Sequence, residues 1–273
     1  MVHVTIHIGR YVYETYPNSM FWILGIALTT CTYAYYACYM TFEAVLFDLD
    51  YTLFDSETSE REALSKTLLE NQISPTDSTI AQYKVINSSL WKMLEREEIN
   101  LEQLRVKRFQ SLLEQLHEIK DPQKLADSFT LNLGKCGKFY PEVQHLLESL
   151  MGVFKLGLVT NGVSETQRLR LEIHDYAKYF DAIVVSGEFG LPKPNPAIFK
   201  EALSLLGLNS SDSVMMVGDS LSSDMKGARI SGLTSCWFNP ASAVDSSTEN
   251  VDYVIQSIDQ LFEILDVPNL KNL

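Results

Sequence analysis

The amino-acid sequence predicts an α/β fold in which a parallel central sheet is covered by helices on both faces and an all-helical segment is inserted after the first strand. Two observations predict it. From Tyr140 onwards, short apolar runs alternate with helical patterns, as in a parallel sheet. Between Asp55 and about Lys138, apolar residues recur at intervals of three and four, which is typical of helices, and no strand-like alternation appears.

The first strand is the apolar run Ala44–Phe47, which we expect to lie in the middle of the sheet. Asp121-Pro122 is a helix start, because proline is tolerated in the first turn. The helical segment is expected to form a cap domain of residues 56–138. Its predicted helices are Ser59–Leu69, Ser78–Glu98, Leu101–His117 and Asp121–Leu133.

Residues 40–55 and 139–273 are expected to form the core domain. Its further predicted strands are Phe154–Val159, Asp181–Ser186, Val214–Val217 and Thr234–Phe238. Its predicted helices are Pro141–Met151, Ser164–Asp175, Pro196–Leu206, Ser222–Ser231 and Ile258–Leu265, and the loop Asn239–Val251 precedes the last of them.

The turn after the first strand reads Asp48-Leu49-Asp50-Tyr51-Thr52. Because side chains alternate along an extended chain, we expect Asp48 and Asp50 to point the same way and Leu49 to point back into the protein. Two acids at a strand end suit a hard cation, or a nucleophile paired with an acid or base. The alternative is an ordinary turn, in which Asp is common.

Three later segments place polar groups at or just after predicted strand ends. Thr160-Asn161 follows one strand, Lys193 lies in a proline-rich turn, and Asp219 follows another strand with Asp224 five residues later. Sites in parallel sheets form at the carboxyl ends of strands, so we expect these groups to meet. Taken singly, a solvated loop lysine and an acid in the first turn of a helix are the alternatives.

This ordered set closely resembles the motifs of the haloacid dehalogenase (HAD) superfamily of phosphatases, over about Phe42 to the C-terminus. The resemblance implies a Rossmannoid three-layer core with a helical cap, and phosphomonoester hydrolysis through an aspartyl-phosphate. It implies that Asp48 is the nucleophile and that Asp50 protonates the leaving alkoxide and then deprotonates the attacking water. Thr52 would steady the Asp50 turn.

The same resemblance implies that Thr160 and the Asn161 amide bind phosphoryl oxygens. Lys193 would neutralise the developing charge and offset repulsion among the carboxylates.

Mg²⁺ is the cofactor that the resemblance implies. Asp219 would bind it together with Asp48 and the backbone carbonyl of Asp50, and Asp224 would hold a metal-bound water or Lys193. An oxygen-only site that contacts the substrate phosphate suits this ion.

Further matches lie in and beside these motifs: Thr52–Asp55, Thr160–Gly162 with Gln167 and Arg170-Leu171, Gly218–Leu221 with Asp224, and Cys236–Pro240. These residues resemble those of the YjjG/YfnB-type pyrimidine 5′-nucleotidases, which implies a nucleoside monophosphate such as UMP or dTMP as substrate. Asp50 argues against a dehalogenase, since those enzymes protonate no leaving group. Tyr51 replaces an Asp or Asn that is frequent there, and we expect little effect because its side chain alternates away from the metal.

Two other functions remain open. The first is a sugar-phosphate or phosphoglycolate phosphatase with the same core, for which residues of the cap would decide. The second is a catalytically silent interaction protein on this scaffold, against which the intact catalytic acids and lysine argue.

The composition limits the partners. A net charge of −13 and a pI of about 4.8 argue against binding to nucleic-acid polymers or anionic membranes, both of which favour basic patches. The expected partner is therefore a small phosphate ester. The four cysteines form no Cys-x-x-Cys pair, which fits a reducing compartment and predicts a cytoplasmic protein.

Residues 21–40 form an uncharged run close to the ~20 residues that span a bilayer. A membrane anchor and a soluble extension are two interpretations. A third is that translation begins at Met40, which makes residues 1–39 a start-site artefact. The third is favoured because the first strand begins at about Phe42, with no linker between it and the apolar run.

Overall fold

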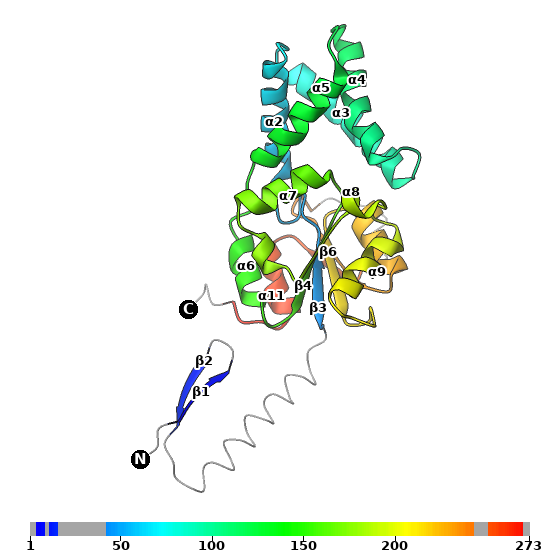
Figure 1. The fold of residues 1–273 in the computed structure, drawn as a ribbon. Coiled ribbons are helices and arrows are strands. Elements are labelled where there is room, and N and C mark those ends of the chain that lie inside the picture. Colours follow the sequence, from blue (N-terminus) through cyan, green and yellow to red (C-terminus); the bar gives the residue numbers. More distant parts are fainter. Residues whose placement is uncertain (1–3, 9–10, 16–41, 243–250, 270–273) are drawn as a thin grey trace.

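The computed structural model describes residues 4–8, 11–15, 42–242 and 251–269. Its centre is a six-stranded sheet in the order β5-β4-β3-β6-β7-β8, in which every neighbouring pair is parallel (Figure 1). The predicted α/β class and the predicted mid-sheet place of the first strand are thus confirmed. The strands are β3 (Ala44–Phe47), β4 (Lys155–Thr160), β5 (Ala182–Val185), β6 (Val214–Gly218), β7 (Thr234–Phe238) and β8 (Tyr253–Ile255).

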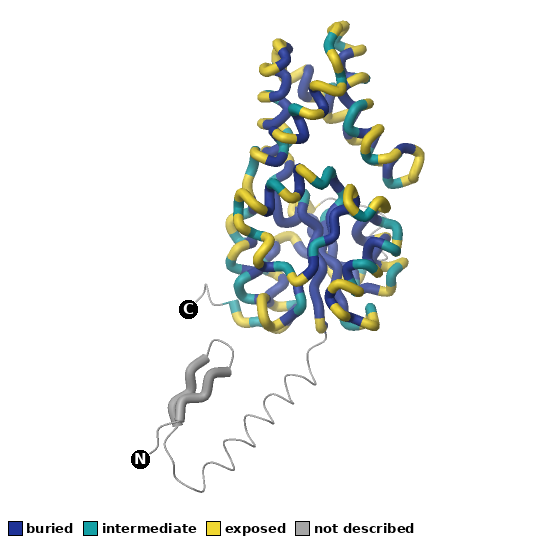
Figure 2. The backbone as a smooth tube through the Cα atoms, viewed as in Figure 1, coloured by how far each residue is buried: buried dark blue, intermediate teal, exposed yellow. Residues whose placement is uncertain are grey.

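Alternation along the strands supplies two hydrophobic layers, one on each face of the sheet. In β3, Val45 and Phe47 join a cluster with α6 (Val143–Leu150) and α11 (Leu261–Ile264). Ala44 and Leu46 join a second cluster with α9 (Pro196–Leu205). The sheet is therefore buried on both faces, as the burial colours show (Figure 2).

The remaining helical segments of this part follow β4, β5, β6 and β8. They are α7 (Ser164–Ile173), the 3₁₀ turn η1 (Ala177–Tyr179), α8 (Ser186–Phe189), α10 (Lys226–Ile230) and the 3₁₀ turn η4 (Ile258–Gln260). A π-helical turn, η2 (Leu221–Met225), precedes α10, so the single helix predicted over Ser222–Ser231 is two segments. The strand β8 and the helix α8 were not predicted, because three or four residues are too few to display a period.

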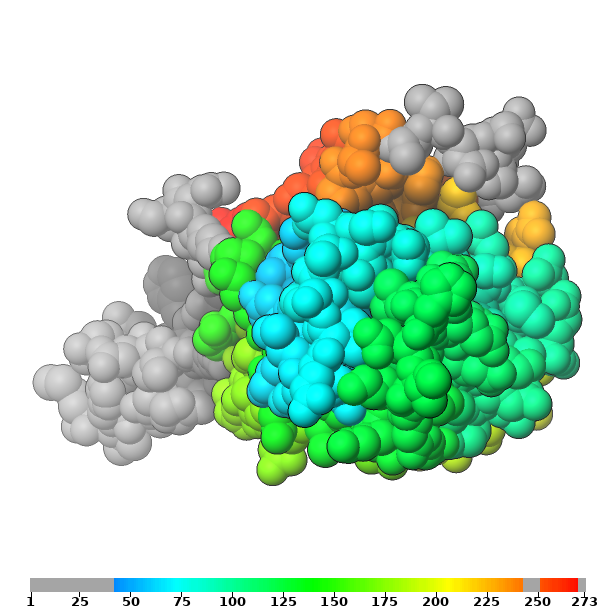
Figure 3. All heavy atoms as spheres, turned by 90° about the horizontal axis from the view of Figure 1, so that it is seen from above, coloured from blue at the N-terminus to red at the C-terminus, as the bar shows by residue number. Residues whose placement is uncertain are grey.

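Helices α2 to α5, which lie between β3 and α6 in the sequence, pack into a bundle. This bundle has a hydrophobic cluster of its own. The rings of Tyr83, Phe109 and Phe129 meet at its centre, with centroids 5.4–5.7 Å apart. Seen from above, the bundle, coloured cyan to green, lies over the core (Figure 3). Its helices are α2 (Ser56–Glu70), α3 (Asp77–Glu95), α4 (Leu101–Leu116) and α5 (Pro122–Lys135).

Local signals set the ends of these helices. Asp55 caps α2 by accepting from the Thr58 N–H, and Thr76 caps α3 in the same way. Asn100 and Gln103 form a capping box at the start of α4. The cap at Asp55 starts α2 at Ser56, three residues before the predicted start at Ser59.

Near the N-terminus, β1 (Val4–Ile8) and β2 (Tyr11–Thr15) form an antiparallel hairpin. No helix in the described part of the chain has the length and hydropathy needed to cross a bilayer. Residues 21–40, for which an anchor was one interpretation, lie outside the described residues.

Candidate active site

Lys193 forms the floor of the site and pairs with two buried carboxylates. Its Nζ lies 2.6 Å from Asp48 Oδ1 and 2.7 Å from Asp224 Oδ1, and it also donates to the carbonyl of Val159 at 2.7 Å. The side chain is only 1% exposed. The ammonium therefore has two hydrogen-bond acceptors and a second carboxylate as an ionic partner, and the lysine is fixed in position.

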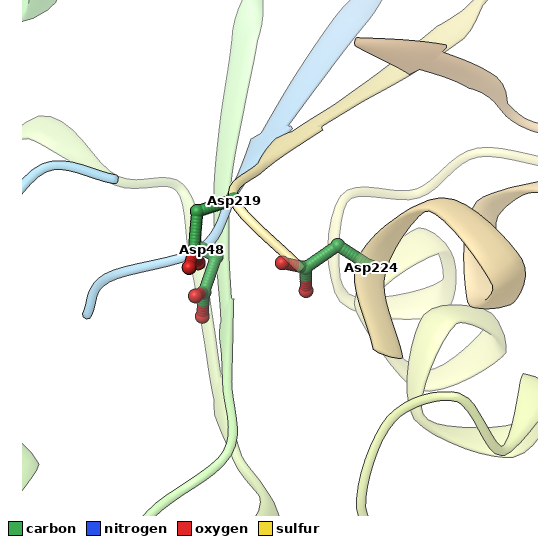
Figure 4. A group of neighbouring side chains, drawn as sticks. All are labelled: Asp48, Asp219 and Asp224. Atoms are coloured by element: carbon green, nitrogen blue, oxygen red, sulfur yellow. The ribbon is translucent and has the colours of Figure 1, made fainter. Parts of the chain in front are cut away.

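Asp48, Asp219 and Asp224 bring carboxylate oxygens within 4.8 Å of one another. Asp48 and Asp219 follow the ends of β3 and β6, and Asp224 comes from the turn η2 (Figure 4). The backbone N–H of Ser220 donates to Asp224 Oδ2 at 3.0 Å and holds this carboxylate toward the end of β6. This oxygen-only group is the donor set that Mg²⁺ prefers.

Asp50 has different partners from those of Asp48, although both line the same cavity. Its Oδ1 accepts from Ser56 Oγ at 2.6 Å and from Arg170 at 2.5 Å. Its Oδ2 accepts from Gln167 Nε2 at 2.6 Å. The Asp50 carboxylate lies outside the three-carboxylate group, while Leu49 between the two acids is buried, as predicted.

The pKa values of the two acids of the first motif are shifted in opposite directions. Burial, with the Asp224 and Asp50 charges, raises the pKa of Asp48 to about 7, against the opposing effect of Lys193. Burial would also raise the pKa of Asp50, but the Arg170 guanidinium and the Ser56 and Gln167 hydrogen bonds lower it below its usual value. Asp50 is therefore held as a carboxylate, the form that accepts a proton.

The other charged groups follow the same physics. Burial, followed by the charges of Asp224 and Asp48, raises the pKa of Asp219 well above its usual range. Burial alone would lower the pKa of Lys193, but the same two carboxylates, Asp224 and Asp48, outweigh it and raise that pKa. The carboxylates of the site thus outnumber its lysine, and a bound cation would offset their mutual repulsion.

The remaining predicted residues also meet here. Thr160 is fully buried, and its hydroxyl accepts from Gln167 Nε2 at 2.8 Å. The Asn161 side chain bonds the backbone of Lys193 twice, at 2.8 and 3.0 Å, and so positions the lysine loop. Thr52 donates to Asp219 Oδ1 at 3.5 Å, so its hydroxyl contacts the carboxylate group rather than the Asp50 turn.

Sequence reasoning gave no role to Gln167 and Arg170, which it used only as marks of resemblance. Both extend from α7 to Asp50, and Arg170 also bonds Ser59 Oγ and the Leu133 carbonyl of the bundle. One feature of the sequence could have indicated their role. They are three residues apart on the helix that follows Thr160, and residues three apart lie on one helix face, here the face directed at the site.

The cavity above these residues has a volume of about 580 Å³ and lies between the sheet and the helical bundle. Its floor consists of Asp48, Asp50, Asp219 and Lys193, and its cap wall consists of side chains from α2, α3, α4 and α5. At the tip of the bundle, Glu97 accepts from Asn195 Nδ2 at 3.4 Å, so the wall touches the core beside the lysine loop.

Comparisons with known proteins agree with this arrangement. The family model described as haloacid dehalogenase-like hydrolase matches residues 45–238. The pyrimidine 5′-nucleotidase YjjG of Escherichia coli is 32% identical over 228 residues, which is 83% of this chain and 99% of that protein. The N-acylneuraminate-9-phosphatase of Rattus norvegicus is 30% identical over 242 residues, which is 84% of this chain and 95% of that protein.

One solved structure is similar throughout the described core and bundle. The HAD-hydrolase YfnB of Bacillus subtilis, a crystal form bound to magnesium that reveals interdomain movement, gives a TM-score of 0.77 at 30% identity. The match covers 82% of this chain and 99% of that one.

Proposed function

This chain belongs to the haloacid dehalogenase-like hydrolase family, and we propose that it is a magnesium-dependent phosphatase of pyrimidine nucleoside 5′-monophosphates. It is an enzyme of the phosphoric monoester hydrolase type, and its substrates are small phosphate esters. The proposal concerns the metal, the residues that act and the identity of the ester.

The contact between Asp48 and Lys193 carries the proposal. A buried carboxylate, held 2.6 Å from a buried ammonium at the bottom of a cavity, is a nucleophile beside a group that stabilises negative charge. A role in structure alone would not require that either group face a cavity of this size.

In the first half-reaction, an Asp48 carboxylate oxygen attacks phosphorus and the bond from phosphorus to the ester oxygen breaks. The leaving alkoxide takes a proton from Asp50 in its acid form, which requires that Asp50 gain a proton and its ion pair with Arg170 weaken. Lys193 neutralises charge on the phosphoryl oxygens, and Thr160 and Asn161 contribute hydrogen bonds at the end of β4.

In the second half-reaction, the Asp50 carboxylate takes a proton from water as the water oxygen attacks phosphorus. The aspartyl-phosphate bond breaks, and Asp48 and inorganic phosphate are released. The hydrogen bonds from Ser56, Gln167 and Arg170 orient Asp50 for this step.

The residues present fit Mg²⁺. Asp48, Asp219 and Asp224 would contribute oxygens to its site, and we keep the Asp50 carbonyl as a proposed further ligand. When bound, the ion supplies positive charge that offsets the crowded carboxylates and the substrate phosphate.

The nucleotide is favoured because the YjjG and PynA relatives are named pyrimidine 5′-nucleotidases, at 32% and 28% identity over 228 residues each. A sugar phosphate is the second candidate, since the N-acylneuraminate-9-phosphatase relative matches a similar share of the chain. We also propose the division into a cap domain of residues 56–138 and a core domain of 40–55 and 139–273, and a cytoplasmic location.

An assay of the purified protein with and without EDTA tests the proposal. The panel contains UMP, dTMP, AMP, phosphoglycolate, hexose phosphates and an aryl phosphate. We expect the highest kcat/KM for UMP and dTMP, with loss of turnover in EDTA that added Mg²⁺ restores. Higher kcat/KM for the sugar phosphates would agree with the proposed mechanism but contradict a nucleotide as the substrate. Turnover that survives EDTA would overturn the role of the metal.

A further inference from the structure

One face of α3 forms part of the cap wall of the cavity. Lys84, Asn87, Trp91 and Glu95 all line it, and their spacing of three and four puts them on one side of the helix. This wall stands opposite the catalytic acids, so it faces whatever the phosphate is attached to.

Asn87 is the unusual member of this face, because it is a polar side chain that is only 8% exposed. Its Nδ2 donates to Glu60 Oε1 at 2.5 Å. Its Oδ1 is buried and has no hydrogen-bond partner among the described residues. The amide is fixed in this orientation, because the reverse orientation would set two acceptor oxygens against each other. A buried carbonyl without a partner is costly, and a ligand that donates to it relieves that cost.

Hydrogen bonds join Asn87 to the catalytic turn. Glu60 accepts from Asn87 through Oε1 and from the hydroxyl of Tyr51 through Oε2 at 3.3 Å. Tyr51 is the neighbour of Asp50. Asn87 is thus two hydrogen bonds away from the turn that carries the nucleophile, and it lines the same cavity.

The surroundings of Asn87 suit a flat ring with polar edges. Trp91 lies one turn further along the same face of α3 and offers an aromatic surface on which a base can stack. Arg108 of α4 also lines the cavity, is 3% exposed, and has an Nε without a partner in the described part of the protein.

We propose that Asn87 selects the base of the nucleoside monophosphate by accepting a hydrogen bond from a ring N–H that lies between two carbonyls. Uracil and thymine carry this imide N–H at N3. Cytosine presents an acceptor nitrogen at the same position, which would face the Asn87 oxygen without a hydrogen. This inference rests on the proposed nucleotidase function and adds the residue that distinguishes among pyrimidines.

The experiment measures how two changes to the substrate base affect turnover, with and without the Asn87 side chain. UMP, N3-methyl-UMP and CMP are compared in the wild type, in Asn87→Leu and in Ser89→Ala, a control at an exposed position of the same helix that does not line the cavity. In the wild type and the control we expect kcat/KM to fall about tenfold to hundredfold from UMP to either analogue, the usual cost of an unpaired buried polar group. In Asn87→Leu both ratios should shrink to a few-fold, mainly through a higher KM for UMP.

Thermal unfolding verifies that Asn87→Leu is folded. If it is not, Asn87→Ala, which removes the acceptor oxygen without setting a second acceptor against Glu60, replaces it and should show the same reduced preference for UMP over both analogues. A full penalty for N3-methylation and for CMP in the folded variant overturns the inference while the nucleotidase function stands. A wild type that turns over sugar phosphates better than UMP overturns both.

Discussion

At the scale of single residues, Lys193 decides the charge balance of the site. A buried ammonium between two buried carboxylates is stable only because each charge is paired, and removing one partner leaves an uncompensated charge. The lysine thus has a structural task besides its proposed catalytic one. For this reason, variants of the acids are better tests of mechanism than variants of the lysine.

Asp48→Asn is the most direct test of the nucleophile. An amide oxygen does not displace the alkoxide, so we expect the rate to fall about 10⁴-fold or more. The fold should survive, because the amide has nearly the same shape and Lys193 keeps Asp224 as its partner. Steady-state kinetics and thermal unfolding measure the two effects. A folded Asp48→Asn protein with near wild-type turnover would refute the assignment.

Arg170→Met tests the buried ion pair with Asp50. Arg170 is 2% exposed and the Asp50 side chain 26%, so the lost pair should lower the free energy of unfolding at neutral pH by about 3–5 kcal/mol. Adding Asp50→Asn should recover part of this loss, because the unpaired charge is then removed. Urea unfolding of the single and double variants measures both.

Arg168→Met is the matched control on the same helix. Arg168 pairs with Glu188 at the surface, with 46% and 40% of the two side chains exposed, and this pair should contribute about 0–1 kcal/mol. Equal costs for the two arginine variants would contradict the importance given to the Arg170 pair.

Tyr51 makes a contact that the sequence-based expectation did not consider. It adopts a left-handed conformation, with φ of 61°, which costs a residue with a Cβ about 1–2 kcal/mol. Its hydroxyl reaches Glu60 of the bundle. The expectation of little effect considered only the metal. The structure shows instead a contact that links the catalytic turn to the cap wall.

At the scale of elements, the end of β6 and the turn η2 determine where Asp224 lies. Gly218 is the last residue of β6, and a Cβ at this position would overlap the Asp224 carboxylate. Because Gly218 leaves this space free, the π-helical turn can bring Asp224 back against the strand and beside Lys193.

Gly218→Ala should therefore lower the free energy of unfolding by about 1–3 kcal/mol and weaken Mg²⁺ binding by displacing Asp224. Thermal unfolding and calorimetric titration of Mg²⁺ measure these effects. Gly207→Ala is the control: φ is +67° there and no atom lies near, so we expect lower stability with unchanged Mg²⁺ affinity. A similar change in affinity in both variants would show that the effect at Gly218 is not local.

At the scale of the whole molecule, stability should depend on pH through the buried acids. In the folded protein without metal, the pKa of Asp48 is about 7, against 3.8 for the group outside the fold. Between these values the folded state binds more protons than the unfolded state, so the contribution of Asp48 to stability falls as pH rises from about 4 to 7. Asp219 acts in the same direction.

Comparison with Asp48→Asn isolates this contribution. In EDTA, the wild type should lose free energy of unfolding relative to the variant as pH rises through this window. Added Mg²⁺ should stabilise the wild type more at pH 7 than at pH 5, because protons compete for the same oxygens. Denaturant unfolding at several pH values provides the measurement. A difference that is constant with pH would contradict the raised pKa.

The sequence by itself determined the α/β class, the order of the longer helices and strands from Ala44 onwards, and the four motifs. Short apolar runs and helical periods are local signals, and the acids follow strand ends whose place in a parallel sheet is fixed by topology. Only the tertiary structure decided which side chains meet: Arg170 and Gln167 on Asp50, Asn161 on the lysine loop, and Tyr51 with Asn87 on Glu60. Those contacts join residues up to 120 positions apart along the chain, and the packing of α3 and α7 around the cavity creates them. No periodicity within one element carries that information.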